Sequence, residues 1–102
     1  MASLPKVLYR GQPPVAAATV TVPAAKQWIV TSVVVSNSTA TATTFRIDLA
    51  GVRLIPDVTL DPAAVFTMDC TQVLNSGDVL AVKAGTASAI SMHISGVEMD
   101  VV

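Results

Sequence analysis

The side chains that could carry out nucleophilic, acid–base or metal chemistry are few in this chain. There is one histidine, His93, and one cysteine, Cys70. A nucleophilic site needs a thiol or hydroxyl beside a base, and a zinc site needs about three or four ligands. One imidazole and one thiol are too few for either. We therefore interpret His93 as a structural or surface residue and Cys70 as a small buried hydrophobe, and we expect no metal and no cofactor.

The carboxylates are scattered singly along the chain. They are Asp48, Asp57, Asp61, Asp69, Asp78, Glu98 and Asp100. Most lie in or beside expected turns, where Asp commonly accepts hydrogen bonds from backbone amides. A calcium loop needs oxygen ligands at alternate positions, and a glycosidase pair needs a cleft with aromatic platforms. Neither pattern occurs, and each glycine stands alone, so phosphate loops are absent too. We expect a protein that is not an enzyme.

Charge and hydropathy patterning exclude two further classes of partner. The net charge is −1, with six basic and seven acidic residues and no adjacent like charges. Nucleic-acid binding needs clustered Lys and Arg, so nucleic acid is not an expected partner. No apolar run reaches the roughly 18 residues of a membrane span, and the first residues lack a signal-peptide pattern. We expect synthesis in the cytoplasm, no membrane span and no internal disulfide.

The composition has more apolar residues than a chain of this length can bury. Of its 102 residues, 52% are hydrophobic and only 13% are charged, against about 25% charged in an ordinary soluble domain. A single domain of this size hides only about two thirds of its surface. The remaining apolar surface predicts self-association, or docking on a larger body.

Alternating apolar and polar residues predict short β-strands. The clearest are 27–36, 43–49 and 89–99; weaker patterns cover 7–9, 19–22, 52–54, 58–60, 64–68 and 79–83. In the strand 27–36 we place Trp28, Val30 and Val34 on one face. The residues expected in the core are Trp28, Val30, Val34, Phe45, Ile47, Leu49, Phe66, Ile90, Met92 and Ile94. Trp28 is interpreted as a core residue, the alternative being an exposed platform for a sugar.

No window has helical spacing, so the fold class is expected to be all-β: an antiparallel β-sandwich, or jelly roll, over residues 15–102. Residues 1–14 contain Pro5, Pro13, Pro14 and Gly11 and are expected to form an extended docking arm. Tyr and Arg are enriched at protein interfaces. The docking residues of the arm are predicted to be Val7, Leu8, Tyr9, Arg10 and Gln12. The alternative is a frayed terminus.

Several segments resemble a group of short bacteriophage virion proteins. They are YRGQPP (9–14), VTVPAAKQWIVTSVVVSN (20–37), TATTFRIDLAGV (41–52), QVLNSGDVLAV (72–82) and MHISGVEM (92–99). Trp28 stands where an aliphatic residue or alanine is usual in that group. The resemblance implies an all-β accessory component of a phage head or tail.

Two hypotheses of function follow. The first is a structural protein of the virion that forms a homo-oligomer, a trimer or a ring, and docks on phage capsid, collar or tail proteins. The second is a host-surface glycan-binding module whose recognition loops are 37–42 and 84–88. The triplet Asn37-Ser38-Thr39 matches a glycosylation site but is interpreted as a polar turn.

Overall fold

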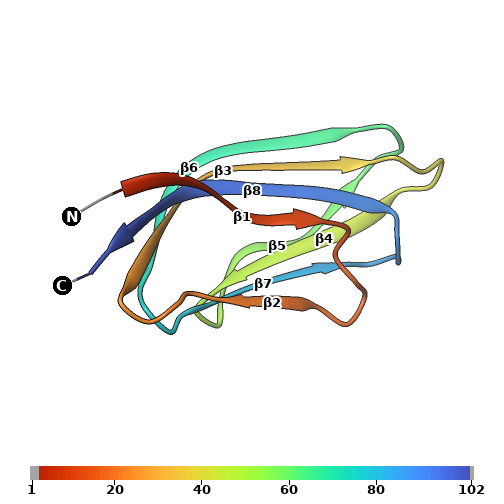
Figure 1. Ribbon diagram of the computed structural model, residues 1–102. Helices are drawn as coiled ribbons and strands as arrows, with labels where there is room; N and C mark the ends of the chain where they lie inside the picture. The colour runs from red at the N-terminus through yellow and green to blue at the C-terminus, as the bar shows by residue number, and fades with distance from the viewer. Residues whose placement is uncertain (1–2, 102) are drawn as a thin grey trace.

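The computed structural model describes residues 3–101, which fold entirely into β-strands and turns (Figure 1). The strands are β1 (Ser3–Gly11), β2 (Ala18–Thr21), β3 (Lys26–Asn37), β4 (Thr43–Leu49), β5 (Val52–Leu60), β6 (Val65–Leu74), β7 (Val79–Ala84) and β8 (Ile90–Asp100). In this part of the chain no helix is long and apolar enough to cross a membrane.

The strands form two packed antiparallel sheets. The first sheet has the order β1-β8-β3-β6 and the second has the order β2-β7-β4-β5. This arrangement is a jelly roll, in which strands far apart in sequence become neighbours. Figure 1 shows the two layers, with both described chain ends at the same end of the sandwich. The predicted fold class is confirmed.

One hydrophobic core fills the space between the sheets. Trp28, Val30, Phe45, Ile47, Ile90, Met92 and Ile94 are each at most 2% exposed. They come from alternate positions of β3, β4 and β8, because successive side chains in a strand point to opposite faces. Leu49 and Phe66 are partly buried and pack against this core, and the Phe66 ring lies 5.2 Å from that of Phe45.

The prediction that Val34 lies in the core is wrong. Its side chain is 37% exposed, whereas Val33 and Val35 are buried. The pairing of β3 with β8 shifts register between Val30 and Ser32. This β-bulge inserts one extra residue and reverses the alternation of faces for the rest of the strand. Uniform alternation from Trp28 onward therefore misses the switch.

The boundary between arm and sandwich also differs from the expected one. Residues 1–14 were expected to lie outside the sandwich, but Ser3–Gly11 form β1, which pairs with β8 from Ser3↔Met99 to Gly11↔Met92. Leu8 is 4% exposed and anchors this strand in the core. Proline is tolerated on an edge strand, where a missing N–H costs no interior pairing. Residues 1–2 and 102 lie outside the described residues.

Candidate interaction surfaces

The structure does not bring the reactive side chains together. His93 lies on the outer face of the first sheet, where its Nδ1 accepts a hydrogen bond from Arg10 Nε at 3.2 Å. Cys70 lies on β6, and its Sγ is 3.5 Å from the Val30 carbonyl oxygen. Burial raises the pKa of the Cys70 thiol, and the charge of Asp69 adds to the effect. Across residues 3–101, no group of three His, Cys, Asp or Glu could hold a metal.

Several carboxylates stabilise turns and strand pairs. Asp48 bonds Arg53 across the β4–β5 hairpin at 2.5 Å, and Asp57 lies 3.8 Å from Arg46. Asp78 Oδ2 accepts a hydrogen bond from the backbone N–H of Asn75 at 2.8 Å in the turn before β7. These contacts are structural roles of the kind that Asp commonly plays in turns and on sheet surfaces.

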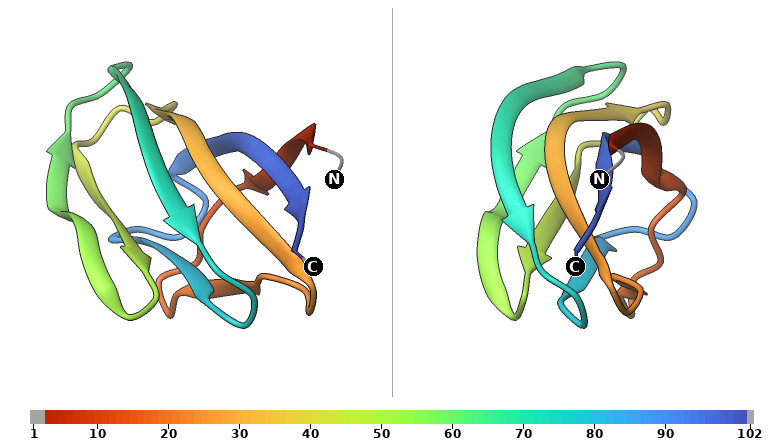
Figure 2. Two further views of the ribbon diagram at one scale, coloured as in Figure 1. Left: turned by 90° about the vertical axis from the view of Figure 1, so that its left-hand side faces the viewer. Right: turned by 60° about the vertical axis from the view of Figure 1, so that its left-hand side comes forward.

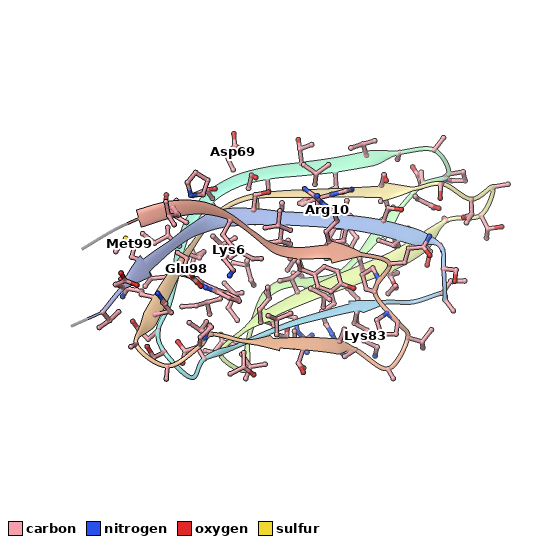
Figure 3. All side chains as sticks on the ribbon, viewed as in Figure 1. Lys6, Arg10, Asp69, Lys83, Glu98 and Met99 are labelled. Atoms are coloured by element: carbon pink, nitrogen blue, oxygen red, sulfur yellow. The ribbon has the colours of Figure 1, made fainter. Side chains whose placement is uncertain are left out.

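A polar cluster links β1 to β8 and β3 near the N-terminal half of β1. Glu98 accepts a hydrogen bond from the indole Nε1 of Trp28 at 2.9 Å and lies 3.2 Å from Lys6 Nζ. The ammonium of Lys6 also stands 5.7 Å from the centre of the Trp28 ring. The indole hydrogen bond, with Lys6, lowers the pKa of Glu98. Figure 3 shows Lys6 and Glu98 side by side. We call Lys6, Trp28 and Glu98 the β1 clamp.

The clamp also settles the role of Trp28. Its side chain is 2% exposed and its N–H is satisfied by Glu98. A buried indole offers no open ring face on which a sugar could stack. Trp28 therefore closes one end of the core.

The predicted docking residues divide into two groups. Leu8 is buried, and Tyr9 is partly buried against the core, where burial raises the pKa of its phenol. These two side chains hold β1 on its own sandwich. Val7, at 45% exposed, and Arg10 remain available on the surface, and Gln12 Nε2 donates to the Ser88 carbonyl at 3.4 Å.

Most of the large apolar side chains that are exposed lie on the edge strands of the two sheets. The exposed residues are Leu4, Val7, Val15, Val34, Val52, Val65, Val73 and Val101. The accessible surface, 5314 Å², is close to the roughly 5,400 Å² expected for a compact chain of this mass. The exposure therefore does not come from an open chain. It reflects a shortage of polar side chains to cover a folded domain.

The β6 edge differs from the other edges of the sandwich. Proteins usually protect an edge with proline, lysine, a bulge or a very short strand. β2 has only four residues, β5 contains Arg53 and Pro56, and β1 contains Pro5 and Lys6. β6 has ten residues with no proline, glycine, lysine or arginine. Asp69 is its single charge, and its pairing with β3 has one irregularity.

A groove lies beside this edge, between β6 and the neighbouring edge strand β5. Its apolar lining includes Leu49, Leu54, Val52 and Val73. Figure 2 shows β6 and β1 at opposite edges of the first sheet. Residue patterning alone does not distinguish β6 from the other strands. The signal was present in the segment VFTMDCTQVL, which has valine near both ends and contains no proline or lysine.

The loops predicted to bind glycans are tied down by their own hydrogen bonds. Asn37 is buried, its Nδ2 donates to the carbonyls of Thr41 and Leu60, and its Oδ1 accepts from Thr39. The side-chain hydroxyls of Thr43 and Thr86 are 3.1 Å apart. Because the amide of Asn37 is buried and fully bonded, the triplet that it begins is a structural turn.

The comparisons show a shared fold and no family. No protein-family model matches the sequence, and no curated protein does. The Drosophila NLP-core, solved for its pentamer formation and histone binding, superposes with a TM-score of 0.56 at 11% identity, covering 93% of this chain and 100% of that chain. A chain of the T13 infectious bursal disease virus particle superposes with a TM-score of 0.54 at 10% identity, covering 95% of this chain and 30% of that chain.

A carbohydrate-binding module of family 35 from Clostridium thermocellum superposes with a TM-score of 0.43 at 15% identity, covering 82% of this chain and 68% of that chain. That similarity is too low to bear on function. The two better superpositions are to a chain of a virus particle and to a protein that forms pentamers. At these identities they establish the jelly-roll fold alone.

Proposed function

We propose that this protein is a non-enzymatic structural component of a bacteriophage particle, which forms a homo-oligomer and docks on capsid, collar or tail proteins. The observation that carries the proposal is the set of large apolar side chains left exposed on a fold that is already compact. Exposed apolar patches on a folded domain mark interaction surfaces.

Two further observations support this function. The jelly roll is a fold of viral capsid domains, and this chain superposes on a chain of a virus particle. The segments YRGQPP and MHISGVEM, among others, resemble short phage virion proteins. A protein present in many copies on a lattice needs only modest affinity at each contact, because linked sites raise avidity by roughly 10² to 10⁴.

The glycan-binding alternative has no observation in its favour. Its two loops contain only Asn, Ser, Thr, Ala and Gly, and none of the chain's four aromatic side chains. Sugar recognition on such modules relies on aromatic platforms. We expect a glycan array to give no binding above background, and a reproducible hit that is lost on changing these loops would favour the alternative.

The experiment that tests the proposed function is imaging of purified particles with and without this protein. We expect density for jelly-roll subunits in several symmetry-related copies, which disappears when the protein is omitted. Particles that are identical in both preparations would overturn the proposed function.

A further inference from the structure

We propose that the β6 edge of one subunit pairs antiparallel with the β1 edge of the next, so that the first sheet continues from copy to copy. The partner that fits this surface is a second copy of the same chain. This inference rests on the proposed function, because it assigns the surface through which the protein would assemble.

The topology permits this pairing without reorienting the subunit. Neighbouring strands run antiparallel throughout β1-β8-β3-β6, so β1 and β6 point in opposite directions. Placing a second sheet beside the first, in the same orientation, therefore brings β6 against β1 as an antiparallel pair. Pairing of an extended strand with an exposed edge supplies main-chain hydrogen bonds that neither edge makes alone.

Charge favours this head-to-tail pairing over pairing of like edges. The only charged residue of β6 is Asp69, whereas β1 carries no acid and has Arg10 in addition to Lys6, which is already paired with Glu98. If the β6 edges of two subunits paired about a two-fold axis, Asp69 of one subunit would approach Asp69 of the other. If two β1 edges paired in this way, their basic residues would approach each other. Opposite charges meet only when β6 pairs with β1, and complementary charge selects partner and register.

Both charged groups are free to make such a contact. Asp69 projects outward from β6 (Figure 3) and has no salt bridge within 4 Å to any side chain that the structure describes. Arg10 also lies on the outer face, where its described side-chain partner is the imidazole of His93. Neither charge is therefore committed to an ion pair within its own described chain.

The register across the sheet places these groups within reach of each other. One straight row on the outer face contains Val7, Ser95, Ser32 and Asp69, and the adjacent row contains Arg10, His93, Val34 and Thr67. If the sheet continues in line, Asp69 faces Val7 of the next copy and lies diagonal to its Arg10. Diagonal neighbours on an antiparallel pair are within reach of long side chains.

Apolar side chains complete the match. A third row contains Pro5, Val97, Ile29 and Val73, so the 51% exposed Val73 would face Pro5 of the next copy. The contact uses a different surface on each partner. Such a head-to-tail contact generates a closed ring when the rotation between subunits closes.

The test is a charge exchange between the two edges. Asp69→Arg and Arg10→Asp are made singly and together, and assembly is measured by native mass spectrometry and sedimentation over a concentration series. Each single reversal opposes like charges and is expected to weaken association by about tenfold or more, whereas the double variant restores it to within about twofold. Asp57→Arg on β5 and Lys83→Asp on β7 make the same charge changes away from these edges and are expected to have no such effect.

Each outcome decides the inference. Single variants that assemble like the wild type, or a double variant that stays as weak as the singles, would overturn the β6–β1 contact while leaving self-assembly intact. A wild type that is monomeric at every concentration and absent from particles would overturn the proposed function, and this contact with it. Thermal unfolding of every variant shows whether the fold is retained.

Discussion

The two edges of the first sheet are built differently. At β1, the buried side chain of Leu8, the clamp of Lys6 with Glu98 and Trp28, and the hydrogen bond from Arg10 to His93 all hold the strand on its own subunit. β6 also pairs along its length with β3 and anchors one end in the core through Leu74, but its inward-facing Phe66, Met68 and Cys70 are only partly buried.

This difference shows how one sheet can be stably folded within its subunit and still have an edge available for pairing with another subunit. The β1 edge contains proline and lysine, which normally discourage uncontrolled pairing, whereas the β6 edge contains neither. These features disfavour pairing of β1 with another β1 edge, so under the proposed contact β1 pairs only with the complementary β6 edge of the next copy, and subunits add in a single direction. Substitutions at or beside each edge can therefore separate the stability of β1 from the assembly role of β6.

Gly96→Ala should have the largest effect, and it acts in the interior of the first sheet, where β8 lies between β1 and β3. A Cβ at this position would collide with the Ile29 carbonyl oxygen and lie 2.9 Å from Leu8 Cδ1. Because the obstruction is backbone, β3 and β8 must separate, and we expect a loss of about 3 kcal/mol in the free energy of unfolding. Chemical denaturation measures it.

Gly85→Ala is the matched control for that substitution. The atom nearest to its added Cβ is the Thr44 hydroxyl, which can rotate away, so we expect a loss of about 1 kcal/mol. Equal losses for the two variants would contradict the claim that Gly96 is required by close backbone approach.

Acidification should loosen β1 before β6. The pKa of Glu98 is lowered by the Trp28 hydrogen bond and by Lys6, so its contribution to stability is fully present above the ordinary Glu value of 4.5 and is lost as pH falls through the lowered value. Hydrogen exchange followed by mass spectrometry should show β1 amides losing protection first, after correction for the intrinsic pH dependence.

Glu98→Gln tests the source of that acid sensitivity. The amide keeps the shape of the side chain and does not titrate in this range, so the difference between β1 and β6 should become independent of pH. A variant that still loses β1 protection in acid would show that another group controls this edge.

Polar substitutions on β6 should affect assembly and leave stability unchanged. Val65→Thr and Val73→Thr alter exposed side chains, so we expect the free energy of unfolding to change by less than about 0.5 kcal/mol. Sedimentation should show weaker association. Val34→Thr, at the centre of the same face, is the control, and equal weakening by it would show that the face and not the edge mediates contact.

The smallest effects are expected in the turns that flank the two edges. Ala17, after β1, and Ala63, before β6, have positive φ angles of 78° and 59°. Glycine adopts this conformation without a steric cost but loses more entropy on folding. We expect Ala17→Gly and Ala63→Gly each to stabilise the protein by about 0.5 kcal/mol, measured by thermal unfolding. Destabilisation at either site would mean that the entropy loss dominates.

The sequence predicted the fold class well because β4 and β8 alternate cleanly, with Phe45, Ile47, Ile90, Met92 and Ile94 all on the core side. Val34 was misplaced because a bulge has no sequence signature strong enough to override regular alternation.

The surfaces were harder to predict than the core. Proline-rich residues 1–14 indicated extended backbone, which is the conformation of β1, but extended backbone alone does not show which strand it pairs with. The position of β6 at the edge of a sheet can be recognised only from the sheet order, because being an edge is a property of topology and not of a segment.

The most direct test of the account is sedimentation velocity of the wild-type protein over a wide concentration range. We predict one discrete assembly of several copies as the main species at micromolar concentration, because association with neighbouring copies would cover the exposed apolar side chains. A single monomeric species at every concentration would contradict the central claim that this jelly roll assembles through its uncovered edges.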